Sequence, residues 1–426
     1  MNRNPQTRHS LPGPDDVTRV QLPNGITVLA RANFNSPSIS LSGYLKTGGL
    51  FDTDDKLGLS DFVSMALMRG TQTRSYREIY DALESSGASF GYSGGTHTTG
   101  FGGKALAEDL DLLLDLLAET LQFPTFPQEQ VERLRAQLLT NLAIRADDTA
   151  EMAALTFDQL VYAGHPYGRP DDGTPESIQA ISRDDLAAFH ARHFGPRGMV
   201  VCVVGAVDPQ QVVARIERVL AGWQNPRQPN MPELPPLPAL DGSRFRKLNM
   251  PGKSQADLVV GAPGPLRSHP GFLAASLGNN ILGQFGMYGR IGDVVRERNG
   301  LAYYAYSSLS GGLGPGPWYV DAGVDPGNVD KTIALIRTEI ERITSEPVTP
   351  EELADSQANY IGRLPLSLES NSGVAAAVLN LERYELGLDY YWRYPELVSA
   401  VTPEQILQTA QEFLHPDRLA VSVAGP

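Results

Sequence analysis

The pattern of apolar and polar positions along this chain changes repeatedly between the period of a strand and that of a helix. Between residues 106 and 121, leucines and acidic residues place the apolar positions on one wide face, which predicts an amphipathic helix. Helices of this kind alternate with short apolar runs that predict strands at Gly25–Ala30, Ser38–Leu45, Ala256–Gly261 and Tyr319–Gly323. The pattern therefore indicates sheets with helices packed on them.

Two segments 220 residues apart carry the same pattern. Ile181–Gly205 and Val401–Gly425 each open with a Ser or Thr suited to an N-cap, continue as a helix, and pass through a proline into an alternating apolar strand that ends in glycine. A second match relates Gly87 to Gly300, because a helix gives way to a strand at both glycines. We therefore expect two copies of one folding unit.

A proline-rich segment separates the two copies. Six of the thirteen residues from 226 to 238 are proline, which disfavours a helix or a central strand and favours extended polyproline geometry. We predict a linker at residues 226–243, an N-terminal domain at 17–225 and a C-terminal domain at 244–426. A polar tail, residues 1–16, precedes them.

Composition and charge exclude several classes of function. The 426 residues include 35 Lys and Arg against 49 Asp and Glu, a net charge of −14 that argues against binding to nucleic acid. No run approaches the roughly 18 apolar residues of a membrane span, and the N-terminal tail has no apolar signal segment. Cys202 is the single cysteine, so no internal disulfide can form. We expect a cytoplasmic protein that binds neither nucleic acid nor membrane.

Residues 58–71, GLSDFVSMALMRGT, resemble the inverted zinc motif of the insulinase/pitrilysin-type metallopeptidases, the family of mitochondrial processing peptidase. In that family a His-x-x-Glu-His stretch supplies two zinc ligands and the general base. Here these three positions are Asp61, Ser64 and Met65. They share one helix face, but a hydroxyl and a thioether are poor zinc ligands and a serine is no carboxylate base.

The resemblance places the family's third ligand, a glutamate, at Asn141, which is neutral and a weak ligand. Every expected ligand is thus replaced. We expect no metal site in this chain and a structural role for the helix that carries residues 61–65.

Further motifs extend the resemblance over nearly the whole chain from about residue 17. They include HPYGRP at 165–170, GTPESI at 173–178 and the stretch from Asn280 to Tyr303. The resemblance implies an α+β protein of two homologous domains, each a mostly antiparallel mixed sheet with helices packed on one face.

In this family the C-terminal domain supplies an Arg and a Tyr seven residues apart, and the resemblance places them at Arg296 and Tyr303. The local pattern predicts a helix that ends at Gly300, followed by a strand in which Leu301, Tyr303 and Ala305 share one side. Spacing alone favours another interpretation, in which Arg296 caps carbonyls or pairs with an acid and Tyr303 is a core aromatic residue. The family resemblance reverses this preference.

A glycine-rich segment precedes this pair. The resemblance suggests that Gly283, Gly286 and Gly289 lie in a loop that contacts substrate. Flexibility at the entry to a helix would explain the same glycines equally well.

Loss of the metal ligands together with retention of the Arg/Tyr pair implies a particular role. The chain would be the zinc-lacking subunit of a heterodimeric zinc endopeptidase, similar to the alpha-type subunit of mitochondrial processing peptidase and its bacterial heterodimeric relatives. It would be inactive alone, with zinc held by a homologous partner, and would act on unfolded peptides.

A non-enzymatic alternative is a structural or peptide-binding protein, like the core subunits of the respiratory bc complex. A neighbouring gene for a chain with His-x-x-Glu-His and without the Arg/Tyr pair would favour the peptidase.

Overall fold

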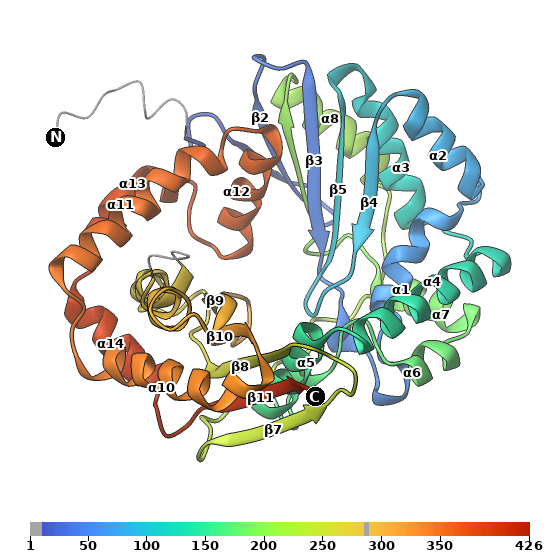
Figure 1. The fold of residues 1–426 in the computed structure, drawn as a ribbon. Coiled ribbons are helices and arrows are strands. Elements are labelled where there is room, and N and C mark those ends of the chain that lie inside the picture. The colour runs from blue at the N-terminus through green and yellow to red at the C-terminus, as the bar shows by residue number, and fades with distance from the viewer. Residues whose placement is uncertain (1–10, 285–288) are drawn as a thin grey trace. The chain divides into compact units, whose positions relative to one another are not determined.

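The computed structural model of this protein describes residues 11–284 and 289–426 (Figure 1). The chain forms two compact units, and each unit combines segments from both halves of the sequence. They therefore differ from the contiguous domains 17–225 and 244–426. Unit 1 comprises Met1–Thr140, Pro170–Glu233 and Leu364–Arg393, and unit 2 comprises Asn141–Arg169, Leu234–Arg363 and Tyr394–Pro426.

Unit 1 is built on a six-stranded sheet with the order β1-β2-β6-β3-β5-β4. β2 and β6 are parallel, and all other neighbours are antiparallel. The strand predicted at Ser38–Leu45 is β3, with the same bounds. The other strands are β1 (Thr18–Gln21), β2 (Thr27–Ala32), β4 (Ser89–Ser93), β5 (Thr99–Leu106) and β6 (Val200–Gly205).

Unit 2 contains a five-stranded sheet with the order β7-β11-β8-β10-β9, in which only β7 and β11 are parallel. This order repeats β2-β6-β3-β5-β4 of unit 1, strand for strand. The prediction of two mixed, mostly antiparallel sheets with helices packed on them is therefore confirmed. The strands are β7 (Arg244–Asn249), β8 (Ala256–Pro263), β9 (Ala302–Leu309), β10 (Pro317–Val324) and β11 (Ala420–Gly425).

The structure also contains the helix that was predicted from residue 106. This helix is α3, which begins at Leu110 because Leu106 still belongs to β5. Within residues 11–284 and 289–426, none of the helices has the length and hydropathy required to cross a membrane. The α-helices are α1 (Leu59–Ala66), α2 (Tyr76–Ser85), α3 (Leu110–Gln122), α4 (Gln128–Ala146), α5 (Thr149–Val161), α6 (Pro175–Ala180), α7 (Arg183–His193), α8 (Pro209–Leu220), α9 (Phe272–Asn279), α10 (Val329–Ser345), α11 (Pro350–Ser367), α12 (Asn371–Arg383), α13 (Tyr390–Ser399) and α14 (Pro403–Phe413).

The segments that match at a spacing of 220 residues fold alike. Ser182 caps α7 and Thr402 caps α14, and each forms a capping box with the residue three positions later. These reciprocal hydrogen bonds satisfy backbone N–H groups that the first helical turn leaves unpaired. After its helix, each segment continues into a fully buried strand, β6 or β11.

One helix of each repeat packs on the sheet of the other repeat's unit. α12, from the C-terminal half, lies on β3 and β6 of unit 1, and α5, from the N-terminal half, lies on β11 and β8 of unit 2. The two helices occupy equivalent places, since their N-cap residues Asp148 and Ser370 are 222 positions apart. Each sheet thus carries helices on both faces, where the sequence predicted helices on one.

Buried contacts and hydrogen bonds fix both exchanged helices. Ala153 of α5 and Ala375 of α12 are completely buried in the apolar clusters that join helix to sheet. The Ser422 hydroxyl donates to the Ala153 carbonyl oxygen at 2.7 Å. In unit 1 the Asn371 amide donates to the Ser38 carbonyl oxygen at 3.0 Å. Neither sheet completes its core with residues from one half of the sequence alone.

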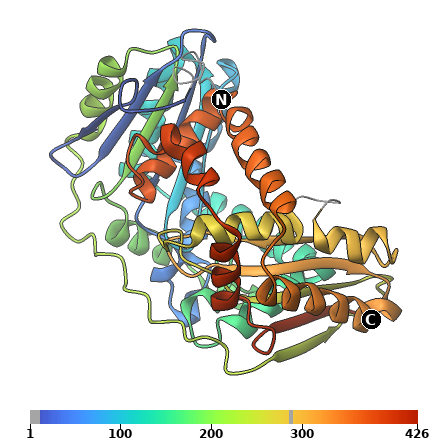
Figure 2. The ribbon, with the colours of Figure 1, turned by 90° about the vertical axis from the view of Figure 1, so that its left-hand side faces the viewer.

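The proline-rich segment 226–243 contains no helix or strand, and Figure 2 shows it as an extended trace. Its start is fixed to unit 1 through the buried Gln228. That amide accepts from the Arg197 backbone N–H at 3.1 Å and donates to the Arg197 carbonyl at 3.0 Å.

We expect residues 1–233 and 234–426, produced separately, to lack cooperative folding. The first fragment lacks α12 and exposes apolar residues that each contribute roughly 2 kcal/mol when buried. Thermal unfolding monitored by circular dichroism tests this. The control is the full chain cut at a protease site inserted after Glu233, which should stay folded; a cooperative transition in either isolated fragment would contradict the prediction.

Candidate functional site

The helix that resembles the zinc motif is α1, and its N-terminus is held by a carboxylate outside the helix. The side chain of Asp52 accepts hydrogen bonds from the backbone N–H groups of Gly58 and Ser60 at 2.9 and 3.0 Å. Gly58 has φ +85°, and a Cβ there would lie 2.9 Å from the backbone of Asp172. The glycine of the motif's frame is therefore required by backbone conformation and close packing.

Ser64 stands where the family has its glutamate base, and it is part of the core of unit 1. Its side chain is completely buried, and the hydroxyl donates to the Ser60 carbonyl oxygen at 2.9 Å. A second hydrogen bond, 3.0 Å long, joins it to the Thr99 hydroxyl on β5. Ser64 therefore connects α1 to the sheet, while Met65 next to it is half-buried.

Asp61 is the one motif position that retains a carboxylate. It is half-buried, and its Oδ1 accepts a hydrogen bond from the Gly94 backbone N–H at 3.2 Å. Burial raises the pKa of Asp61 to about 6; the Gly94 hydrogen bond opposes this shift, and the negative charges of Asp172 and Asp171 add to it. The carboxylate is thus held where its charge is unfavourable.

A zinc ion does not fit the side chains at these positions. The Ser64 hydroxyl is occupied by two hydrogen bonds, and Asn141, at the third-ligand position on α4, is an exposed amide. In the described parts of the chain, no three His, Cys, Asp or Glu side chains are grouped so that they could hold a metal ion. The donor set is a single carboxylate, that of Asp61.

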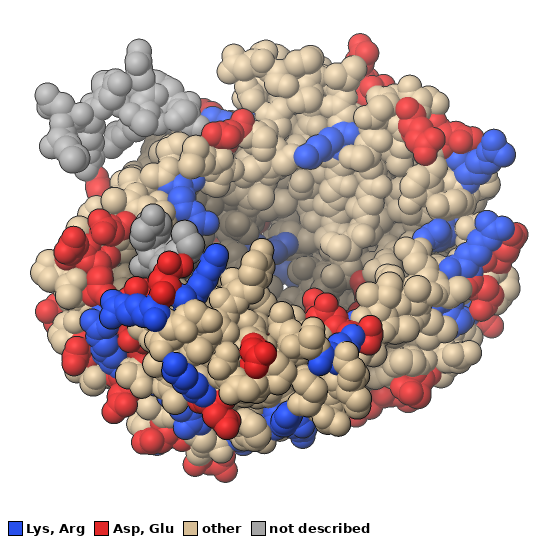
Figure 3. All heavy atoms as spheres, viewed as in Figure 1, with Lys and Arg blue, Asp and Glu red and all other residues tan. Residues whose placement is uncertain are grey.

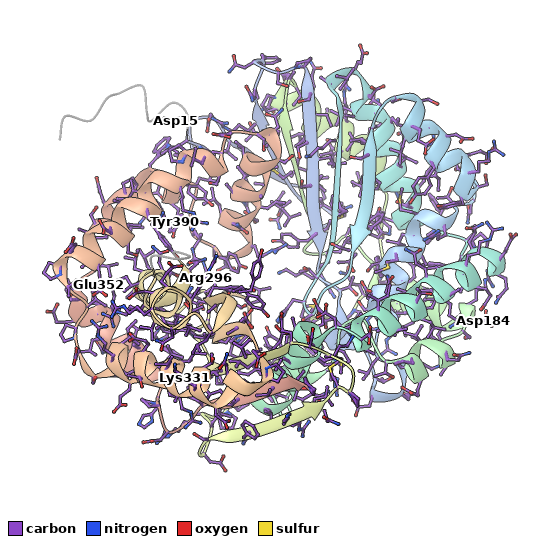
Figure 4. The ribbon with its side chains drawn as sticks, in the orientation of Figure 1. Asp15, Asp184, Arg296, Lys331, Glu352 and Tyr390 are labelled. Carbon is purple, nitrogen blue, oxygen red and sulfur yellow. The ribbon has the colours of Figure 1, made fainter. Side chains whose placement is uncertain are left out.

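Arg296 lies in unit 2, on a short π-helix at Gly292–Glu297 that precedes β9 (Figure 4). Val295 anchors this turn in the core, and Gly300 ends it with φ +60°. The Arg296 side chain is exposed, and its nearest acid is Glu297, at 3.8 Å. An exposed pair at that distance contributes little, so the guanidinium is available for another partner.

Tyr303 is the most exposed of the large apolar and aromatic side chains described, at 84%. Leu301 and Ala305, which the predicted alternation places on the same side, are buried. Within the described residues, the Tyr303 hydroxyl has no hydrogen-bond partner. The predicted alternation is therefore wrong at this residue.

A β-bulge explains the exposure of Tyr303. Tyr304 lies opposite Gly323 on β10, and Ala302 lies opposite the next residue, Val324. Tyr303 is the extra residue between these two pairs. Because a bulge interrupts the alternation of side chains, it can turn one residue away from the core.

Two glycines of the proposed substrate loop have a packing role. A Cβ on the buried Gly283 would lie 2.7 Å from the backbone nitrogen of Ser307 on β9. A Cβ on Gly289 would lie 2.7 Å from the Cα of Gly283. Both positions require glycine because backbone segments meet there. Gly286 lies outside the described residues.

A polar group on the sheet of unit 2 was not predicted from the sequence. Asp257 on β8 is buried, and its carboxylate accepts hydrogen bonds from the side chains of Tyr304, Gln255 and Thr149. Asp321 lies on β10, two positions before Gly323, the residue that is paired with Asp257. An acid within an otherwise apolar strand is the signal that could have identified both residues.

Comparison with known proteins identifies the family. The model described as insulinase (peptidase family M16) matches residues 27–169, and the model described as peptidase M16 inactive domain matches residues 180–360. Together they span most of the sequence. The chain belongs to the insulinase, or M16, peptidase family.

Similar proteins align with nearly the whole of this chain. An uncharacterized zinc protease of Streptomyces coelicolor is 26% identical over 417 residues, which are 96% of this chain and 90% of that protein. An uncharacterized zinc protease of Mycobacterium leprae is 27% identical over 421 residues, which are 96% of this chain and 92% of that protein.

Solved structures share the fold. A peptidase M16 inactive domain from Pseudomonas fluorescens superposes with a TM-score of 0.90 at 24% identity, over 96% of this chain and 98% of that one. A protease from Helicobacter pylori has a TM-score of 0.88 at 20% identity, over 98% and 100% of the two chains.

We expect Asp61→Asn to stabilise the protein above pH 6. The folded-state pKa of about 6 exceeds the ordinary 3.8, so ionisation of Asp61 lowers the free energy of unfolding as pH rises through this window. Asparagine can still accept from Gly94. After allowance for solvent screening, the gain at pH 8 is about 1 kcal/mol, and it vanishes near pH 4.

Urea unfolding at pH 4, 6 and 8 measures the effect, with Asp355→Asn on the exposed face of α11 as the charge-matched control. An Asp61→Asn curve parallel to the wild-type curve across this range would contradict the prediction.

Proposed function

We propose that this chain is the zinc-lacking subunit of a heterodimeric zinc endopeptidase and supplies Arg296 and Tyr303 to an active site completed by a homologous zinc-bearing partner. The observation that carries the proposal is a contrast between two sites. Ser64, at the position of the general base, is buried in the core, whereas Arg296 and Tyr303 are exposed. The match to a peptidase M16 inactive domain and the relatives named zinc proteases support it.

The exposed pair suits the stabilisation of a reacting amide. A guanidinium and a phenol can both donate hydrogen bonds to a peptide carbonyl and to the oxyanion that forms when water attacks it. One such donor contributes on the order of 3 kcal/mol to transition-state stabilisation. The bulge that turns Tyr303 outward would then have a catalytic use, since strain or irregularity of this kind is frequent beside active sites.

In this proposal, zinc and the general base belong to the partner, so the chain alone binds no zinc and cleaves no peptide. The substrate is an unfolded peptide, which can add as a strand to a sheet edge. β4 and β9 are the edge strands beside β5 and β10. A cytoplasmic location is part of the proposal, in keeping with a single, buried cysteine.

Arg296→Ala should reduce peptide cleavage by the two-chain complex about 100-fold, because one donor to the oxyanion is lost. The tagged chain is purified from its own cells together with its partner, and kcat is measured on an unstructured fluorogenic peptide. The control is Arg298→Ala, two positions from Arg296. It removes an exposed arginine that is paired with Asp293 and should leave kcat unchanged.

Unchanged cleavage by Arg296→Ala in an intact complex would refute the catalytic role. A stable complex that contains no zinc and cleaves nothing would favour the structural alternative.

Tyr303→Phe should lower kcat about 10- to 100-fold with little change in KM. The ring remains, and only the hydroxyl donor to the transition state is removed. Wild-type and variant complexes are compared in steady-state assays with the same peptide. A rise in KM at constant kcat would show that Tyr303 binds substrate without stabilising the oxyanion.

A further inference from the structure

A sheet face in unit 2 carries three tyrosines and an acid. α5 covers β7, β11 and β8 on this side, and the side chains of β9 and β10 that point the same way begin at its edge, where the ring of Tyr319 lies 5.9 Å from the ring of Phe157. Tyr306 is 42% exposed, and the other members are half-buried. We call this surface the tyrosine face, formed by Tyr304, Tyr306, Tyr319 and Asp321.

Asp321 is the acid of the tyrosine face. It lies opposite Tyr306 on β9 and opposite Val259 on β8. Within the described residues, its carboxylate has no hydrogen bond and no ion pair. The charges that act on it come from Asp257 and Asp158, both negative. A half-buried carboxylate among like charges is unfavourable until a cation binds beside it.

Asp257, by contrast, is fully occupied. The Tyr304 hydroxyl reaches it at 2.5 Å, and the Gln255 amide donates at 2.8 Å. The ring of Tyr304 lies across Gly323, where any side chain would collide with it. The structure thus satisfies the hydrogen-bonding capacity of one acid internally and leaves the second, Asp321, facing an aromatic surface.

The strands themselves provide no cation. β8, β9 and β10 contain two aspartates and neither lysine, arginine nor histidine. The rings of Tyr304 and Tyr306 lie side by side, with centroids 5.7 Å apart and an interplanar angle of 35°. An aromatic surface next to a carboxylate suits a cationic side chain, which can stack on a ring and pair with the acid.

The first repeat shows that the fold does not require these residues. In the equivalent register of unit 1, Gly102 occupies the place of Asp321, and Gly91 that of Tyr306. A Cβ on Gly91 would meet no atom within 4 Å, so side chains there are not excluded by crowding. Figure 3 shows few charged side chains over β3, β5 and β4. The tyrosine face is therefore a feature of the second copy alone.

We propose that the tyrosine face binds the lysine or arginine side chain of an extended peptide, with its charged group on Asp321 and its stem against Tyr306. The inference rests on the proposed function and names the substrate class, peptides with a basic residue. Arginine can make two parallel hydrogen bonds to one carboxylate, and the tyrosine ring then stacks on the guanidinium.

Burial, with the charges of Asp257 and Asp158, raises the pKa of Asp321 to about 7. The groups facing it are Asp257 on β8, Asp158 on α5, and the phenols of the tyrosine face on β9 and β10. A bound cation requires the ionised form. Affinity for a basic peptide should therefore rise as pH increases through about 7.

The test uses the isolated full-length chain and two fluorescein-labelled unstructured decapeptides that differ only in one arginine or its neutral isostere citrulline. Fluorescence anisotropy at pH 8 should give about tenfold tighter binding of the arginine peptide. Asp321→Asn should abolish this preference and its pH dependence, and Tyr306→Leu should weaken it. Asp355→Asn is the charge-matched control and should retain the wild-type preference.

Equal affinity of the wild-type chain for both peptides, absence of binding by either, or an unchanged preference in folded Asp321→Asn would overturn the inference. Circular dichroism and thermal unfolding verify that each variant is folded. Because this assay needs no partner and no cleavage, it separates the two proposals. A complex that cleaves no peptide would refute the peptidase function. The anisotropy measurement would still test whether the tyrosine face binds a basic side chain.

Discussion

The structure depends on the burial of one helix from each half of the chain against the sheet formed mainly by the other half. An α-helix laid on a sheet buries apolar area from both, at roughly 25 cal/mol per Å². α5 and α12 do this at equivalent positions of the two repeats. As a result, neither repeat has a complete core by itself, and the polypeptide must find contacts more than 200 residues apart. Duplication here produced mutual dependence between the copies.

The two repeats share the same core architecture but differ in the polar and charged residues that they carry outside it. In the first repeat the family's zinc-motif helix persists as α1, but its polar groups now make internal hydrogen bonds. In the second repeat the same sheet register holds a bulge with Tyr303 and an acidic, aromatic face. The scaffold is common, and the surface chemistry has diverged on the positions that the core does not use.

Much of the fold could be predicted from the sequence, because its signals are local. The strand Ser38–Leu45 and the repeated cap, helix and strand after Ser182 and Thr402 follow from alternation and capping. The exchange of α5 and α12 could not be predicted, since a helix's apolar stripe does not identify the sheet it will cover. The predicted start of α3 was early because leucine is common to strand ends and helices alike.

For the candidate site, the sequence predicted which residues occupy the family's functional positions, but it did not predict how their side chains are arranged. The replacement of every zinc-motif position follows directly from the sequence, whereas the hydrogen bonds of Ser64 depend on the packing of α1 on β5. The bulge at Tyr303 was not predicted because pairing with the partner strand determines a bulge. Tyr304 lies four positions after Gly300, whereas its counterpart Ser89 lies two positions after Gly87 in the first repeat. Asp321 was not predicted because a single acid in an apolar strand, although unusual, does not reveal which residues it faces.

The burial of the Ser64 hydroxyl also limits which substitutions α1 can accept. A carboxylate introduced at that position would enter a fully enclosed space beside Thr99, and an unpaired buried charge costs several kcal/mol. A single substitution that introduces a metal ligand or a carboxylate base into α1 would therefore lower stability. Metal binding could compensate for this loss only after the other ligands were also in place. Packing thus opposes the family's zinc chemistry at α1, whereas the half-buried and exposed side chains of the tyrosine face in unit 2 can change without entering the core.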